Sequence, residues 1–273
     1  MAIPSAETQF AIRIAKAAGR ILLQGFGTGV RVEHKSREID LVTEFDRRSE
    51  EYILGRIRKA FPGHRILAEE SGGIPASPAA RGQAGAGDDP LWLVDPLDGT
   101  TNFAHGLPIF SVSIALRAGG QTRLGVVYDP TRKDCYWAER GKGAYCEAAR
   151  LHVSKTAELG KSLLVTGFPY DAWSNPKNNL DYFAQFAVRS RGVRRLGSAA
   201  LDLAYLAAGR FDGYWEMRLA PWDVAAGGLI AEEAGARVTA MDGESDYLTE
   251  SPSLIAANPA LHAKMTAVIL GMN

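Results

Sequence analysis

Residues 92–103 read WLVDPLDGTTNF, and this stretch carries more information about the fold than any other. The apolar run at 91–94 predicts a short buried strand that leads directly to Asp95. Asp98 follows after a proline turn, so two carboxylates lie three residues apart at the end of a strand. We expect them to converge on one point, where both cannot easily stay ionised without a counter-charge.

A divalent cation is the natural counter-charge for such a pair, because Mg²⁺ prefers oxygen ligands and keeps several of its waters. Pro96 leaves the carbonyl of Leu97 poorly placed for a sheet ladder, so this oxygen is a further candidate ligand. Gly99 lets the backbone approach a bound group closely, and Thr100 offers a hydroxyl. The competing interpretation is a plain Asp-Gly turn that closes a hairpin.

Further acidic residues lie at the ends of predicted strands or the starts of predicted helices. They are Glu69 and Glu70 after a strand at 65–68, Asp46 at the start of a helix over 45–60, and Asp223 at the start of a helix over 221–234. Taken singly, adjacent acids indicate a solvated surface, and an acid in a first helical turn indicates capping. Because these residues come from both halves of the chain, their recurrence favours one shared site.

The hydrophobic pattern changes near residue 150. Before it, the pattern predicts a helix at 5–24, a mobile surface loop at 72–89 and an antiparallel sheet. After it, strands alternate with helices, so we place a domain boundary between residues 147 and 148. The predicted strands lie at 64–69, 91–94, 110–116, 122–128, 135–138, 144–146, 162–166, 213–215 and 254–256, and the later helices at 178–188, 199–208, 221–234 and 260–270.

The composition argues against several classes of protein. Of the 273 residues, 46% are hydrophobic and 23% charged, as in an ordinary globular protein, and 31 basic residues balance 31 acidic ones. We therefore expect no nucleic-acid partner, since such proteins usually carry a basic excess. The sequence has no apolar run of membrane-spanning length, and its first residues do not read as a secretory signal. Cys135 and Cys146 flank a predicted turn, and we expect both to stay reduced in a cytoplasmic protein.

The motifs resemble those of the inositol monophosphatase family of magnesium-dependent, lithium-sensitive phosphatases. The resemblance spans most of the chain, and its most specific parts are DPLDGTTNF (95–103) and WDVAAG (222–227). The other similar stretches are Lys35-Ser36 with DLVTEFD (40–46), AEES (68–71) and RLGSAALDLAYLAAGRFDGYWE (195–216). The form is closer to the bacterial inositol-1-monophosphatase branch than to the histidinol-phosphate or bisphosphate-nucleotide branches.

This resemblance implies two to three Mg²⁺ ions in each active site. The implied ligands are Glu69, Asp95 and the Leu97 carbonyl for the first ion, Asp95, Asp98 and Asp223 for the second, and Glu69 with water for a weaker third. Thr100 and Asp46 match the pair that orients and deprotonates the attacking water. Glu70 matches a second, supporting acid.

The resemblance also implies how the substrate binds. The N–H groups near Gly99 and Thr100 would meet the phosphate oxygens. The positions matching contacts to the inositol hydroxyls are Asp98, Gly197, Ala199, Glu216 and Asp223. Residues 167–170 (GFPY) depart from the loop that contributes to the substrate pocket in animal members.

For the fold, the resemblance implies a layered α/β (α+β) protein, an αβαβα sandwich. It would combine a large antiparallel sheet in the first half with a smaller, mostly parallel sheet in the second. The site would lie between them, because Asp95 and Asp98 come from one half and Asp223 from the other. A homodimer is implied as well.

Three functions compete. The first is magnesium-dependent hydrolysis of inositol monophosphate by direct attack of water, since no Cys-X₅-Arg or phosphohistidine pattern is present in the sequence. The second is a sister phosphatase that acts on fructose 1,6-bisphosphate, histidinol phosphate or another sugar phosphate. The third is a catalytically silent metal-binding protein with a scaffold or regulatory role.

Overall fold

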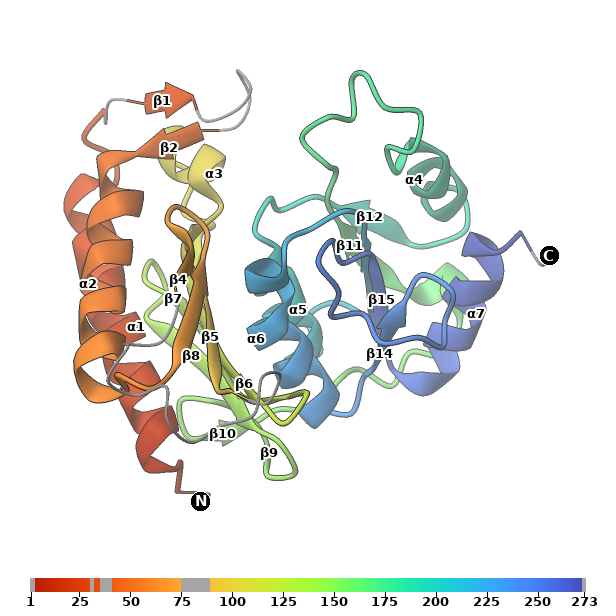
Figure 1. Cartoon of the computed structure of the whole chain (residues 1–273). Helices are drawn as coiled ribbons and strands as arrows, with labels where there is room; N and C mark the ends of the chain where they lie inside the picture. Colours follow the sequence, from red (N-terminus) through yellow and green to blue (C-terminus); the bar gives the residue numbers. More distant parts are fainter. Residues whose placement is uncertain (1–2, 30–31, 35–40, 75–88, 272–273) are drawn as a thin grey trace.

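Helices and sheets alternate in five layers in the computed structural model, which describes residues 3–29, 32–34, 41–74 and 89–271 (Figure 1). The outer helical layer is α1 (Ala6–Gly25) with α2 (Glu44–Ala60), and the middle one is α5 (Ala199–Ala207) with α6 (Pro221–Glu233). Helices α4 (Leu180–Ala187) and α7 (Pro259–Ile269) cover the far side of the second sheet. The predicted αβαβα sandwich is confirmed.

Among the described residues, the large sheet has eight strands, and the pairing of β3 with β5 is its one parallel pairing. In spatial order the strands are β10 (Ala149–Arg150), β9 (Gly143–Cys146), β8 (Asp134–Glu139), β7 (Gln121–Asp129), β6 (Ser111–Ala118), β5 (Leu91–Asp98), β3 (Arg65–Ala68) and β4 (Gly72–Ile74). A separate antiparallel pair joins β1 (Val32–His34) to β2 (Leu41–Thr43). Both cysteines lie on the β8–β9 hairpin, as predicted, and both are free thiols.

Strand β4 contradicts the predicted loop at its first residues. Gly72–Ile74 pair with the backbone of β3, because the outer edge of that strand offers unpaired N–H and C=O groups. Glycine-rich sequence carries no periodicity, so the pattern gave no sign of this strand. Residues 75–88 of the predicted loop lie outside the described residues, as do Lys35, Ser36 and Asp40.

Strand β5 also differs from the prediction, because it continues past Val94 to Asp98 instead of ending in a turn. Its register against β6 shifts between Asp95, which faces Ser113, and Asp98, which faces Ser111. Pro96 lies within this bulge, where the missing N–H removes no ladder hydrogen bond.

The smaller sheet of the described chain has five strands, four of which run in the same direction. Its order is β12 (Gly192–Arg194), β11 (Leu163–Thr166), β13 (Gly213–Glu216), β15 (Leu254–Ala257) and β14 (Arg237–Ala240). The pairings of β11 with β12 and with β13 are parallel, and the two pairings of β15 are antiparallel. The predicted mostly parallel sheet is confirmed, since β15 alone runs against the other four strands, although β12 and β14 were not predicted. The prediction also lacked the short strands β1, β2 and β10, the helix α3 (Thr100–Ala104) and the 3₁₀ helix η2 (Leu159–Lys161).

Helix α6 fills the space between the two sheets because small residues let it approach its neighbours. A Cβ atom on Gly125 of β7 would lie 2.7 Å from the Ala226 carbonyl oxygen. A Cβ on Gly227 would lie 2.7 Å from the Cβ of Leu203 in α5. The close packing fixes the start of α6, and with it Asp223, against the large sheet.

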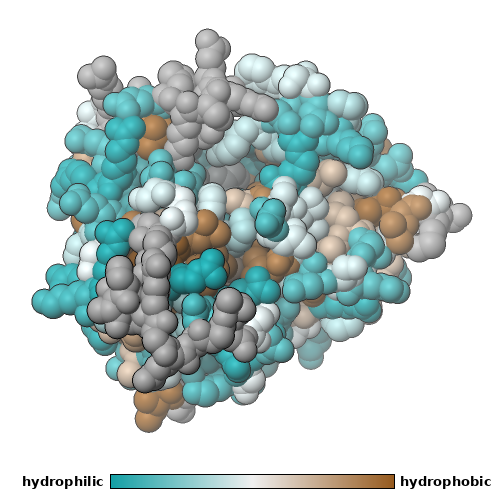
Figure 2. Space-filling view, in the orientation of Figure 1, coloured by the Kyte–Doolittle hydropathy of each residue, from teal (hydrophilic) through white to brown (hydrophobic). Residues whose placement is uncertain are grey.

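The molecular face in Figure 2 is mainly hydrophilic, with hydrophobic residues in separate patches. In the described part of the chain, α-helices lack the length and apolar character that crossing a membrane requires.

Candidate functional site

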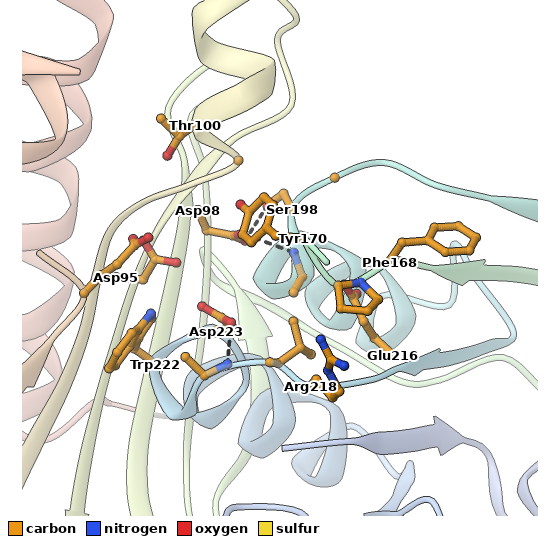
Figure 3. Close-up of a pocket in the computed structure, with 18 of the residues that line it drawn as sticks. Asp95, Asp98, Thr100, Phe168, Tyr170, Ser198, Glu216, Arg218, Trp222 and Asp223 are labelled. Carbon is orange, nitrogen blue, oxygen red and sulfur yellow. Dashed lines mark hydrogen bonds between the residues drawn. The ribbon is translucent and has the colours of Figure 1, made fainter. Parts of the chain in front are cut away.

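A cavity of about 380 Å³ lies between the two halves of the chain, within the size range of small-molecule sites. Acidic side chains from both halves line it (Figure 3). They are Glu69 after β3, Asp95 and Asp98 on β5, Glu216 on β13 and Asp223 on α6. The structure therefore brings together acids that are up to 154 positions apart in the sequence (from 69 to 223).

The bulge in β5 places Asp95 and Asp98 in the same cavity wall. The N–H of Leu97 donates to Asp95 Oδ1 at 3.0 Å, which fixes the first carboxylate against its own strand. Burial raises the pKa of Asp95 well above its usual value, and the charge of Glu69 raises it further. A side-chain hydrogen bond between Asp95 and Glu69 acts in the same direction.

Asp98 is held at the start of helix α5. Its carboxylate accepts hydrogen bonds from Ser198 Oγ at 2.6 Å and from the Ala200 N–H at 2.8 Å. The Ala199 N–H donates to the other oxygen at 3.2 Å. Burial raises the pKa of Asp98 to about 6, although these hydrogen bonds oppose the shift.

Asp46 and Thr100 form a buried pair behind the cavity wall. Thr100 Oγ1 donates to Asp46 Oδ1 at 2.9 Å and also lies 3.0 Å from the Leu97 carbonyl oxygen. Asp46 Oδ2 accepts from the N–H and hydroxyl of Thr43 at 2.9 and 2.6 Å, so it also caps helix α2. Burial raises the pKa of Asp46 to about 6.

Asp223 and Glu216 come from the second half of the chain. Asp223 Oδ2 accepts from the Ala220 N–H at 2.7 Å, and burial raises the pKa of Asp223 well above its usual value. Glu216 accepts from the Tyr214 hydroxyl at 2.9 Å, and burial raises its pKa to about 7. Gly167 packs directly against this carboxyl, so a Cβ there would force the Glu216 side chain to shift.

Two glycines bring the halves into contact at the cavity. Gly99 has φ +99°, and a Cβ there would lie 3.0 Å from the Ile109 carbonyl oxygen and 3.2 Å from that of Gly197. Asn102, two residues into α3, donates from Nδ2 to the carbonyl oxygens of Ile109 and Leu196 at 2.8 Å each. These bonds fix the backbone around both glycines.

The structure places nearly all predicted site residues around this cavity. Those that line it are Glu69, Asp95, Leu97, Asp98, Gly99, Thr100, Gly197, Ala199, Glu216 and Asp223. Asp46 lies behind Thr100. Glu70 is not among the lining residues and lies in a separate depression with Glu50 and Arg58, in the turn that follows β3. Its supporting role stays a prediction.

The acids that line the cavity are the candidate metal ligands. Within the described ranges, no group of three or more His, Cys, Asp or Glu side chains is arranged as it stands to hold a metal ion. The donor set nevertheless fits a hard cation, because every candidate ligand is an oxygen and burial beside like charges disfavours the ionised acids. In the same ranges, no ion pair within 4 Å involves Asp95, Asp98 or Asp223.

Several lining residues were not predicted as site residues. Gly167, Phe168, Pro169 and Tyr170 belong to the 167–170 stretch already noted for its difference from animal members. The others are Arg195, Ser198, Arg218, Leu219, Ala220 and Trp222. Ser198 had a local signal, because a serine directly before a predicted helix is a common N-cap. Arg195 and Arg218 had none, since a lone arginine is usually solvated.

Comparison with known proteins agrees with this geometry. The layered fold and the acid-lined cavity are those of a phosphatase of the inositol monophosphatase superfamily. The model of the inositol monophosphatase family matches residues 4–270, and the chain belongs to this family.

Relatives cover almost the full length of the chain. A protein named Nus factor SuhB from Pseudomonas aeruginosa is 42% identical over 252 residues, which are 91% of this chain and 90% of that protein. The solved inositol monophosphatase of Anabaena is 40% identical with a TM-score of 0.84, covering 97% of this chain and 95% of that one. The extragenic suppressor protein SuhB of Bartonella henselae is 37% identical with a TM-score of 0.87, covering 97% and 98%.

Proposed function

We propose that this chain is a Mg²⁺-dependent phosphomonoesterase that hydrolyses inositol monophosphate to inositol and phosphate. One observation carries the proposal. Buried carboxylates from both halves of the chain line one cavity, beside the hydrogen-bonded pair of Thr100 and Asp46, which can transfer a proton. The same arrangement would also serve a sister phosphatase acting on fructose 1,6-bisphosphate, histidinol phosphate or another sugar phosphate.

Two to three Mg²⁺ ions would bind to the acidic wall. Glu69, Asp95 and the Leu97 carbonyl would hold the first, and a weaker ion would use Glu69 with water. The second would use Asp95, Asp98 and Asp223, whose side chains lie around one space in the cavity (Figure 3). Bound Mg²⁺ supplies neutralisation of the phosphate charge, a lower pKa for water and stabilisation of the leaving alkoxide.

The chain's own residues would position and deprotonate the attacking water. Thr100 Oγ1 would accept a proton from the water while its own proton passes along the existing hydrogen bond to Asp46 Oδ1. Asp46 is suited to receive it, because burial holds its pKa near 6, close to neutral pH. The N–H groups near Gly99 and Thr100 would donate to phosphate oxygens, and Gly197, Ala199 and Glu216 would contact the substrate hydroxyls.

Phosphate release tests the proposal directly. Inositol 1-phosphate, fructose 1,6-bisphosphate and histidinol phosphate should be compared with and without Mg²⁺. The expected result is Mg²⁺-dependent release, fastest from inositol 1-phosphate and inhibited by millimolar lithium. Faster release from another substrate would favour the sister phosphatase, and no release from any of them would favour a silent metal-binding protein.

The proposal also covers the cellular location, the oligomeric state and the partners of the protein. We place the protein in the cytoplasm as a homodimer with no membrane or nucleic-acid partner. Relatives carry the name Nus factor, yet the balanced charge of this chain gives no independent support for a role with nucleic acid.

A further inference from the structure

The cavity wall opposite Asp95 and Thr100 is built by the 168–179 segment, which joins β11 to α4, together with Arg218 (Figure 3). From this segment, Phe168, Pro169 and Tyr170 line the cavity. This is the region where the sequence departs from the animal members of the family. It is therefore the place to look for what sets substrate preference.

Arg218 is held in this wall by an unusual backbone conformation. Its φ is +57°, a left-handed conformation that non-glycine residues rarely adopt and that recurs at functional sites. The Arg218 N–H donates to Ser253 Oγ at 2.9 Å, and the next N–H, from Leu219, donates to the Pro252 carbonyl at 2.8 Å. The side chain is thus directed by a backbone that is fixed on both sides of its Cα.

The guanidinium of Arg218 is paired with Asp171 of the 168–179 segment. The two side chains are 29% and 14% exposed, so the pair is partly shielded from solvent. Asn175 Nδ2 also donates to Asp171 at 3.1 Å, which holds the carboxylate in place. A guanidinium that already donates to a carboxylate has fewer donors left for a phosphate.

The second arginine of the wall, Arg195, also has an acid nearby. Arg195 lies close enough to Glu216 for its charge to lower the pKa of that acid, against the larger effect of burial. Among the described residues, each arginine that lines the cavity therefore has an acid nearby, which reduces the positive charge that this wall offers to an anion. A wall with Tyr170 and a paired Arg218 fits a polyol better than a second phosphate.

We propose that Asp171 is a specificity-determining residue of the phosphatase proposed above, on which this inference rests. By neutralising Arg218, Asp171 makes the site select alcohols that carry a single phosphate. Without Asp171, the guanidinium of Arg218 would face the cavity with free donors and would bind a second phosphate on the same substrate.

The experiment compares fructose 1,6-bisphosphate with fructose 1-phosphate, which differ only in the second phosphate. In Asp171→Asn, the ratio of kcat/KM for the bisphosphate over the monophosphate should rise about ten-fold, the scale of one charge-assisted hydrogen bond at a partly exposed site. The double variant Asp171→Asn with Arg218→Gln should return the ratio to within about two-fold of wild type. The matched control is Asp181→Asn at an exposed position of α4, which should leave the ratio unchanged.

A binding measurement keeps this inference separate from the proposed function. Calorimetric dissociation constants of the two sugars, taken with Mg²⁺ in a Thr100→Val background, should show the same shift without needing turnover. If the wild-type protein hydrolyses no phosphate ester, the proposed function fails and the binding ratio alone decides the inference.

Two results would overturn the role of Asp171. One is a change below two-fold in the ratio, both in turnover and in binding. The other is a rise that persists in the double variant, because a shift that does not need Arg218 comes from rearrangement of the segment. If Asp171→Asn lowers the thermal midpoint, Asp171→Ser must give the same ten-fold rise for the inference to stand.

Discussion

Helices α2 and α6 begin in the same way but on opposite sides of the cavity wall. Asp46 and Asp223 each occupy the third position of a helix, and each accepts a hydrogen bond from the backbone N–H three residues earlier. The second oxygen of Asp46 is occupied by Thr100, whereas Asp223 lines the cavity. Capping and function are therefore not competing explanations for these acids, because one carboxylate has two oxygens and can serve both.

The comparison predicts its largest effect at Asp223. Asp223→Asn keeps an oxygen for the Ala220 N–H but removes the negative charge, so activity should fall roughly a thousand-fold, the scale of several kcal/mol of metal-ion catalysis. The thermal midpoint of this variant without metal should stay level or rise, because the substitution removes one of several buried negative charges. Phosphate release and thermal unfolding in EDTA measure the two effects, and Asp181→Asn serves as the control. A large loss of stability with little loss of activity would reduce Asp223 to a helix cap.

Thr100 should matter next, as the link between Asp46 and the cavity. Thr100→Val keeps the shape of the side chain but removes the hydroxyl, so kcat should fall about a hundred-fold with KM little changed, as expected for a lost proton-transfer group. The neighbouring Thr101 is exposed, and Thr101→Val is the matched control. Equal effects of the two substitutions would show that the hydroxyl of Thr100 has no special role.

The start of a third helix, α5, offers a smaller test. Asp98 at the end of β5 accepts hydrogen bonds from the first N–H groups of α5, and Ser198 Oγ donates to the Asp98 carboxylate at 2.6 Å. Ser198→Ala should raise the Mg²⁺ concentration needed for half-maximal activity by about ten-fold, because groups that orient a metal ligand affect affinity on this scale. Ser111, which reaches the same carboxylate at 3.4 Å, should give a weaker effect when changed to alanine. The opposite ranking would contradict the proposed support of Asp98 by Ser198.

The smallest effect concerns the pH dependence of stability. The pKa of Asp46 is raised to about 6 by burial, above about 3.9 in an unfolded chain. The folded state therefore holds the proton more tightly, and this contribution to stability is lost as pH rises through 6. Asp46→Asn does not titrate, so in EDTA its thermal midpoint relative to wild type should increase by a few degrees from pH 5 to pH 7.5. A difference that stays constant with pH would show that Asp46 titrates at its ordinary value.

Local features of the fold and site could be predicted from the sequence, and long-range ones could not. The starts of α2 and α6 follow from capping and helical periodicity, which depend on a few adjacent residues. The bulge in β5 depends on the register against Ser111 and Ser113, which no local pattern encodes. The same holds for the pairing of Arg218 with Asp171, whose partners lie 47 positions apart.

The predicted convergence of the acids on one point shows the same limit. Spacing in the sequence indicated which acids belong together, and they do line one cavity. Spacing could not predict the directions of the side chains. The consecutive acids Glu69 and Glu70 line two different depressions.

The contact between Gly125 and Ala226 has a consequence for sites far from the cavity. Gly125 lies on β7, a strand that contributes no lining residue, yet its missing side chain sets how deeply α6 can settle. Adding a single methyl group there would push on the helix one turn after Asp223. We therefore expect a substitution at Gly125 to lower activity although no residue that lines the cavity is changed. Natural variants in the large sheet can impair activity in the same indirect way.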